Sequence, residues 1–222
     1  MNSVKIKRAG AKARRPAYHH GDLRQQLLLA TEQIILERGV EGFTLREAAR
    51  RAGVSPAAPA HHFKDAKGLL TEVALLGFRD FGAALEAADK LGGADPARRL
   101  REQARAYVRF ALAHPARFEL MFRHDKHDKT NEEFQRVARH AYGVLEGAIR
   151  AATQTSAQAP LSSQARGFLL ANWSIVHGFA HLALGGELGG PDGESTTSDE
   201  ALLSLMLAHL PAMPARFTTM RS

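Results

Sequence analysis

The side chains best suited to chemistry in this sequence are histidines spaced to bind a metal ion. His177 and His181 are four residues apart and would share one face of a helix, as zinc ligands on a helix do. No glutamate lies between them, so the carboxylate base of a metalloprotease helix is missing. His124 and His127, each followed by an aspartate, form a second cluster, whose hydrophilic surroundings favour a solvated loop. Metal binding stays open at both pairs, but we predict neither a metal nor another cofactor.

Other catalytic patterns are not recognisable in the sequence. It has no glycine-rich phosphate loop followed by lysine, no dinucleotide fingerprint and no nucleophile elbow. It contains no cysteine, which excludes disulfides, thiolate nucleophiles and cysteine-ligated zinc and fits a cytoplasmic location. A serine, a histidine and an acid brought together only by folding stay open, but no spacing indicates them. We therefore predict that the chain is not an enzyme.

Positive charge is concentrated in the first third of the chain. The formal net charge is +7, and residues 1–70 contain 13 Lys and Arg against 6 Asp and Glu, whereas residues 71–222 contain 17 of each. Lysines and arginines that neutralise phosphates give salt-sensitive affinity for DNA. Residues 1–17 form a basic arm that includes Arg14 and Arg15 and lacks the apolar face of a membrane-surface helix. We expect this arm to be disordered until it binds DNA, and we predict no membrane partner.

Residues 44–63, TLREAARRAGVSPAAPAHHF, have the pattern of two short helices joined by a tight turn. Thr44 can cap the first helix, with Glu47 three residues later to complete a capping box. Gly53 can end that helix, and Ser55 is suited to cap the next one. The pattern predicts a helix-turn-helix, whose second helix enters the major groove of DNA.

The second of these helices is expected to run from Ser55 to about Phe63, with Phe63 turned toward the core. Pro59 lies near its fourth position, where it should remove one hydrogen bond and tighten the first turn without breaking the helix. A structural helical hairpin without DNA is the alternative, and the surplus of positive charge argues against it. The residues predicted to contact DNA are Arg14, Arg15, Thr44, Arg46, Ser55, Pro56, Ala57, Ala58, Ala60, His61, His62 and Lys67.

The rest of the chain is expected to be helical throughout, with no alternating strand pattern and no internal repeat. The predicted fold is all-α, with a three-helix DNA-binding domain and a larger helical domain that has a core of its own. We place the basic arm at residues 1–17, the DNA-binding domain at 18–78 and the larger domain at 79–222. Loops are predicted at 124–133 and 185–198. Helices are predicted at about 23–38, 65–85, 95–114, 115–122, 134–152, 161–185 and 199–210.

One predicted helix, residues 168–184, is apolar on nearly all sides. Asn172, Ser174 and the two histidines interrupt it, which suits a buried helix of a soluble protein better than a membrane span. Two such helices from each of two chains would cover one another in a four-helix interface, so we predict a homodimer. The last helix offers a complementary apolar face made of Leu202, Leu203, Met206 and Leu210.

Aromatic residues of the larger domain could line a small-molecule pocket, although core packing is the default for most of them. Arg101, Arg105 and Arg109 recur every four residues. A solvated face explains such a stripe most simply, and an anionic ligand is the alternative. The residues predicted to contact a ligand are Tyr107, Phe118, Phe122, Trp173 and His177.

Residues 18–78 resemble the DNA-binding domain of TetR-family transcriptional regulators. The family has Thr at the start of the second helix, Ala-Gly-Val-Ser at the turn, His-Phe or Tyr-Phe at the end of the recognition helix, and Lys then Leu in the fourth helix. The sequence departs from it at Ala60, where the family usually has a tyrosine that reaches a backbone phosphate; His61 or His62 can replace that contact only in part. The matching residues are Thr44, Ala49, Ala52, Gly53, Val54, Ser55, His62, Phe63, Lys67 and Leu70.

The C-terminal part resembles regulators of this family with a Trp-His-Gly motif, through Trp173, His177 and Gly178 and through HPARFELMF at 114–122. This resemblance implies a helical domain that dimerises and binds a small-molecule effector, which the motif does not identify. Together the resemblances imply a homodimeric, ligand-responsive repressor that binds a palindromic operator in double-stranded DNA. A non-sensing architectural DNA binder, without a pocket, and a helical metal-dependent enzyme are the alternatives.

Overall fold

The computed structural model describes residues 20–189 and 198–209, and every regular element in these two ranges is a helix. The all-α prediction is therefore confirmed. Three predicted features lie outside the described residues: the basic arm with Arg14 and Arg15, most of the linker before the last helix, and Leu210. The α-helices are α1 (His20–Arg38), α2 (Leu45–Arg51), α3 (Ala58–Phe63), α4 (Ala66–Gly92), α5 (Pro96–Ala113), α6 (Pro115–Phe122), α7 (Glu132–Thr153), α8 (Ser163–Leu184) and α9 (Asp199–Ala208).

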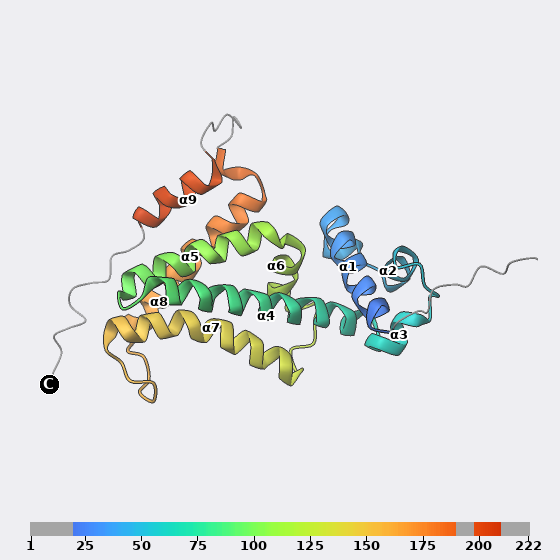
Figure 1. Cartoon of the computed structure of the whole chain (residues 1–222), viewed down its shortest axis with the longest axis horizontal. Coiled ribbons are helices and arrows are strands. Elements are labelled where there is room, and N and C mark those ends of the chain that lie inside the picture. Colours follow the sequence, from blue (N-terminus) through green and yellow to red (C-terminus); the bar gives the residue numbers. More distant parts are fainter. Residues whose placement is uncertain (1–19, 190–197, 210–222) are drawn as a thin grey trace, which may run out of the picture.

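Helix α4 connects the two parts of the molecule (Figure 1). Its first turns pack against α1 and α3, which together with α2 form a small N-terminal head. Its later turns pack against α5, α6 and α7, and α8 covers α5 and α7. Leu69, Val73 and Phe81 of α4 are all buried in one apolar cluster that continues from the head into the larger bundle. The two parts thus share one long helix and one core.

Side-chain caps begin the helices of the head largely as the sequence predicts. The Thr44 hydroxyl accepts a hydrogen bond from the Glu47 N–H (3.2 Å), and Asp65 caps α4 by accepting one from the Gly68 N–H (2.8 Å). The capping box is only half formed, because the Glu47 carboxylate binds arginines of α2 instead of the Thr44 backbone. Gly53 takes a φ of 68° at the turn, a conformation that glycine adopts without steric cost.

The prediction that the second helix begins at Ser55 is wrong, because α3 begins at Ala58. Residues 55–57 form a turn in which the Ser55 carbonyl accepts a hydrogen bond from the Ala58 N–H (3.0 Å), and the Ser55 side chain makes no cap. The later start places Pro59 within the first turn of α3, where its missing N–H costs no intrahelical hydrogen bond. The proline therefore moves the start of the helix.

Helix α8 is long and apolar enough to cross a membrane by length and composition, and one side of it is buried in the bundle. Core helices of soluble proteins meet the same criterion. The predicted partner face on the last helix needs one correction, because Leu203 is only 1% exposed and belongs to the core of its own chain. Leu205, on the opposite side of α9, is 57% exposed.

Candidate DNA-binding surface and ligand cavity

The head exposes most of the residues predicted to contact DNA. Thr44 and Arg46 at the start of α2 are exposed, as are Ser55, Pro56 and Ala57 in the turn. In the following helix, Ala60 and His61 are exposed, Ala58 and His62 are half-buried, and Phe63 is buried in the core. Pro59 is buried as well. One side of α3 therefore anchors the helix, and the other presents small side chains and an imidazole.

Ion pairs divide the cations of the head into two groups. Arg51 donates hydrogen bonds to Glu37 (2.6 and 2.8 Å) and to Glu47 (2.9 Å), and Arg50 also binds Glu47. The two arginines hold the pKa of Glu47 down at about 2, so this carboxylate stays charged and keeps them occupied. In contrast, Arg46 is exposed and has no carboxylate partner among the described residues.

Lys64 and Lys67 extend this second group of cations. Lys64 lies between α3 and α4, and Lys67 lies in the first turn of α4. Both are exposed, and neither has an ion-pair partner among the described residues. Lys64 follows Phe63 with a φ of 68°, which ends α3. Lys64 was not among the residues predicted to contact DNA, although a lysine directly after the recognition helix was a usable signal. Exposed, unpaired cations of this kind can meet phosphates.

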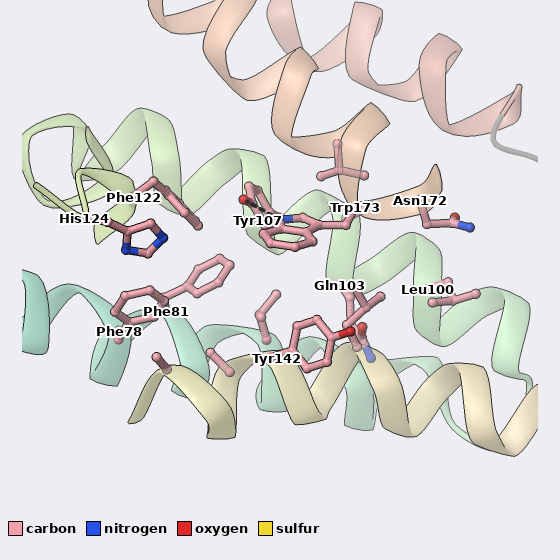
Figure 2. A pocket seen from close by; sticks show the side chains of 16 residues that line it. Phe78, Phe81, Leu100, Gln103, Tyr107, Phe122, His124, Tyr142, Asn172 and Trp173 are labelled. Carbon is pink, nitrogen blue, oxygen red and sulfur yellow. Dashed lines mark hydrogen bonds between the residues drawn. The ribbon is translucent and has the colours of Figure 1, made fainter. Parts of the chain in front are cut away.

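The larger part of the molecule contains a partly open cavity of about 210 Å³ between α4, α5, α7 and α8, with the end of α6 at its wall. Aromatic and aliphatic side chains form most of its wall, as Figure 2 shows. No Lys, Arg, Asp or Glu is among the lining residues that the structure describes. Gln103, His124 and Asn172 are the polar residues at the wall besides the tyrosines and the tryptophan. The aromatic rings at the cavity belong to Phe78, Phe81, Tyr107, Phe122, Tyr142 and Trp173.

Three of the five predicted ligand contacts line this cavity, namely Tyr107, Phe122 and Trp173. Phe118 is not part of the wall, because it is completely buried behind it, with its ring centroid 5.2 Å from that of Phe122. His177 is not part of it either, since its ring lies against the outer side of Phe122 and Phe118. These two residues support the wall from behind.

A hydrogen-bond chain holds the aromatic wall from α5 to α8. The Tyr107 hydroxyl and His177 Nδ1 are 2.7 Å apart, and Trp173 Nε1 donates to the same hydroxyl at 3.4 Å. Burial raises the pKa of Tyr107 well above its usual range, and burial together with His181 lowers the pKa of His177. Both side chains are therefore neutral near pH 7. The chain fixes the position of the Trp173 ring.

Several cavity residues were not predicted from the sequence. Phe78 and Phe81 lie on α4, and Tyr142 lies on α7. Gln103 is one helical turn before Tyr107 on α5 and shares its face. That spacing was the usable signal for Gln103. Nothing local marked Tyr142, because its part in the wall depends on how α7 packs.

No group of three or more His, Asp or Glu residues that could hold a metal ion is found in the described part of the chain. The rings of His177 and His181 lie 4.5 Å apart and pack on Phe118. The loop cluster differs from the prediction of a solvated loop, because His127 is completely buried and stacks on Phe134 at 4.3 Å. The Asp128 N–H donates to the Thr71 hydroxyl (2.9 Å), which folds the loop back onto α4.

The arginine stripe on α5 binds carboxylates instead of facing only solvent. Arg109 donates to Glu200 of α9 (2.6 Å), and Arg105 lies 3.5 Å from the same carboxylate. Arg101 is 4.0 Å from Asp95. The stripe therefore helps to hold α9 against α5, and none of its residues lines the cavity.

The N-terminal head contains a helix-turn-helix with exposed cations. One continuous helix joins this head to a bundle that contains a cavity. This arrangement is typical of two-part helical DNA-binding regulators. Comparison with known families agrees. The family described as "Bacterial regulatory proteins, tetR family" matches residues 27–73, and "Tetracyclin repressor-like, C-terminal domain" matches residues 100–210, which is half of the chain. The chain belongs to the TetR family of transcriptional regulators.

Solved structures show the same fold. A protein with unknown function from Rhodococcus sp. RHA1 is 32% identical, with 88% of this chain and 99% of that chain covered and a TM-score of 0.66. The TetR family transcriptional regulator PfmR from Thermus thermophilus is 20% identical over 83% and 91% of the two chains, with a TM-score of 0.60. AibR in complex with isovaleryl coenzyme A and operator DNA is 19% identical over 85% and 97%, with a TM-score of 0.63. Comparison with curated proteins finds no match.

Proposed function

We propose that this chain is a ligand-responsive repressor that binds a palindromic operator as a homodimer. The observation that carries the proposal is that α4 belongs to both functional regions. Near its start, Gly68 packs against the Phe63 carbonyl at the end of α3, and farther along Phe78 and Phe81 line the cavity. The proposed domain boundary at residues 78 and 79 falls inside this helix. A ligand that favours one position of α4 therefore also favours one position of the head.

The proposed DNA-binding surface keeps the predicted residues and adds Lys64. The alanines of residues 57–60 offer methyl groups suited to thymine methyls, and His61 offers a ring nitrogen to a base edge. Arg46, Lys64 and Lys67 are suited to phosphates, and the basic arm would add further phosphate contacts. Base-specific hydrogen bonds from α3 are then few, so shape and methyl contacts carry much of the specificity.

The proposed dimer interface is the exposed side of α8 and α9. Leu170 and Leu182 of α8 and Leu205 of α9 are 46%, 48% and 57% exposed, which is costly for a lone chain in water. Gly167 and Gly178 have open space where a Cβ atom would lie, so a second α8 could approach closely. A two-fold axis at this side would cover the same apolar residues in both chains.

A second link joins the cavity wall to the head through the loop after α6. Phe122 and His124 line the cavity. In the same loop, Arg123 and Lys126 each bind the Glu41 carboxylate of the head at 2.5 Å. We name these three residues, Glu41, Arg123 and Lys126, the loop clasp. It offers the ligand a route to the head that does not pass through α4.

The Trp-His-Gly resemblance and a cytoplasmic location are parts of the proposal. Trp173 and His177 both reach the Tyr107 hydroxyl, so two of the three motif residues hold one network behind the cavity wall. Gly178 lies on the proposed dimer side. AibR has been solved with a ligand and operator DNA together, which supports pairing the two functions in this fold. An operator in the chromosome would place the protein in the cytoplasm.

Selection of bound sequences from random DNA by the full chain tests this proposal. We expect a palindrome with half-sites about one helical turn apart or slightly more, because two-fold protein symmetry must match the DNA. An asymmetric motif would contradict the homodimer, and a featureless one would favour a non-sensing architectural DNA binder. Transcription from a promoter that carries the selected site then assigns the sign, since a repressor lowers the transcript level.

A further inference from the structure

We propose that the effector is a small, neutral, mainly aromatic molecule with a hydroxyl or N–H group that donates a hydrogen bond to Gln103. This inference rests on the proposed function and deepens it, because it assigns the chemistry of the ligand. Size gives the first limit. An apolar cavity of about 150 Å³ holds benzene, so this cavity of about 210 Å³ accommodates about eight to ten non-hydrogen atoms.

The charge of the wall gives the second limit. The lining residues include no Lys, Arg, Asp or Glu, and the one imidazole among them, His124, is exposed at the loop. A carboxylate or an ammonium group in the cavity would lose its hydration without gaining an ion partner, which is strongly unfavourable. The rings of Phe81, Tyr107 and Trp173 instead offer edge and face contacts to another ring.

The side chain of Gln103 supplies the polar feature of the wall. It is only 3% exposed, and its Nε2 donates to Asp89 Oδ1 (2.6 Å) and to the Val144 carbonyl (3.3 Å). Because both partners are acceptors, the amide has one allowed orientation. Arg99 keeps the Asp89 carboxylate in place with two hydrogen bonds of 2.7 and 2.8 Å. The Gln103 Oε1 atom is left buried without a hydrogen-bond partner among the described residues.

A buried acceptor without a donor is uncommon, and each case calls for an explanation. Other polar side chains at the wall already have partners. Trp173 Nε1 donates to the Tyr107 hydroxyl, which also shares a hydrogen bond with His177, and Asn172 Nδ2 donates to the Phe168 carbonyl at 2.8 Å. Among the described residues, the other buried side-chain atoms without a partner are the ring nitrogens of His127, which does not line the cavity. Gln103 lines the cavity, but neighbouring side chains cover its Oε1 atom in this structure. A donor on the effector would supply the missing partner of Oε1 by displacing these neighbours slightly. Tyr142 lines the cavity and is 41% exposed, so its ring lies where the cavity meets solvent.

The single tryptophan of the chain, Trp173, lines the cavity and reports on binding there directly. Its fluorescence can be titrated in the full chain with four probes of similar size: 4-ethylphenol, ethylbenzene, 4-methylbenzoate and phenyltrimethylammonium. We expect 4-ethylphenol to bind about tenfold more tightly than ethylbenzene, which lacks only the donor. Both should bind more tightly than the anion and the cation.

Gln103→Leu removes the acceptor while keeping a side chain of similar length. We expect this variant to bind 4-ethylphenol and ethylbenzene equally. Gln25→Leu, the same exchange at an exposed position of α1, is the matched control and should keep the tenfold preference. If the melting curve shows that Gln103→Leu does not fold, the comparison of the four probes on the natural chain still tests the proposal.

Tighter binding of 4-methylbenzoate or phenyltrimethylammonium than of 4-ethylphenol would overturn the exclusion of charge. Equal affinities of the natural chain for 4-ethylphenol and ethylbenzene would overturn the role of Gln103. The proposed function fails in a different way: 4-ethylphenol would then bind with the expected preference, but the selected operator would stay bound at saturating probe. In that case the proposed ligand chemistry would be supported, and the proposal that the chain is a ligand-responsive repressor would be wrong.

Discussion

The helix caps of the head join residues close together in the sequence, whereas the cavity wall joins residues far apart in the sequence. In the head, the caps join near neighbours, as Thr44 does with Glu47 and Asp65 with Gly68. The cavity is closed by side chains between Phe78 and Val176, on five different helices and in the loop after α6. The head can therefore be damaged by one local change, whereas the cavity depends on how whole helices pack. The two regions should also fail separately, although α4 belongs to both.

The largest expected effect is at Gly68, where the head depends on a close backbone approach. A Cβ atom there would lie 1.9 Å from the Phe63 carbonyl oxygen, which belongs to backbone and cannot move aside alone. We expect Gly68→Ala to cost about 2–3 kcal/mol and to abolish operator binding, while probe binding at the cavity persists. Melting curves, operator titration and Trp173 fluorescence measure the three quantities.

Gly143→Ala is the matched control for this variant. Gly143 lies in α7 with nothing within 4 Å of a built Cβ, so alanine there should stabilise the chain by about 0.5–1 kcal/mol. A Gly68→Ala chain with the melting temperature and operator affinity of the natural chain would show that the turn between α3 and α4 adapts. The contrast between a rigid head and a separate cavity would then be lost.

The same contrast explains what could be predicted from the sequence. The caps at Thr44 and Asp65, the turn at Gly53 and most helix bounds depend on residues within four positions, so their spacing is sufficient. The start of α3 was missed because Ser55 is an equally good cap by type, and the position of Pro59 overrides it. Local patterns determine the head almost completely, apart from such competition between two local preferences.

The cavity was predicted only in part, for reasons of packing. Tyr107, Phe122 and Trp173 follow from aromatic clustering and a motif resemblance, and they do line it. Whether an aromatic residue faces the cavity or stands behind it depends on helix rotation, which the sequence does not reveal. Phe118 is completely buried behind the wall for this reason. Gln103 could be recognised only after its hydrogen-bond partners were in place.

The next largest effect should be at the cavity itself. Trp173→Ala removes a ring that is only half-buried, so it is expected to cost about 2 kcal/mol, less than the loss of a fully buried ring, and folding is checked first by a melting curve. The folded variant should bind the operator but should no longer release it with 4-ethylphenol. Trp173→Phe keeps a ring in the wall and should retain most of the response. If Trp173→Ala still releases DNA at the original probe concentration, the ligand binds elsewhere.

Phosphate contacts of the head predict a smaller and sequence-independent effect. Lys67→Ala should weaken binding to all DNA sequences about equally and reduce the slope of log affinity against log salt by about one. Lys90→Ala, an exposed lysine at the far end of the same helix, should leave the slope unchanged. Equal slopes for the natural chain and Lys67→Ala would remove this lysine from the DNA-binding surface.

The loop beside the cavity should make stability depend on pH. Burial, reinforced by His124, lowers the pKa of His127 below its ordinary value of 6.5. The unfolded chain therefore binds the proton more readily, and the stability that requires a neutral ring is complete above about pH 6.5 and is lost as the pH falls. His127→Leu should reduce the drop in melting temperature between about pH 7.5 and 5.5. His61→Leu, at an exposed position, should keep the drop of the natural chain; an unchanged drop in His127→Leu would assign it to other groups.

The smallest expected effect, on the loop clasp, tests how separate the two regions are. Glu41→Gln weakens the pairing of the head with Arg123 and Lys126, which are exposed enough for water to compete, so the melting temperature should change little. The coupling should change more, because the loop that contacts Glu41 also carries Phe122 and His124 to the cavity wall. Coupling is measured as the ratio of probe affinities with and without operator, which must equal the ratio of operator affinities with and without probe.

Asp125→Asn is the matched control for the clasp, since Asp125 binds Arg123 within the loop and does not reach the head. We expect Glu41→Gln to lower the coupling ratio and Asp125→Asn to leave it closer to that of the natural chain. Equal effects of the two variants on the coupling ratio would mean that the loop affects coupling only through its own internal structure and not through its contact with the head. Transmission from the cavity would then run through α4, because that helix carries residues of both the head and the cavity wall.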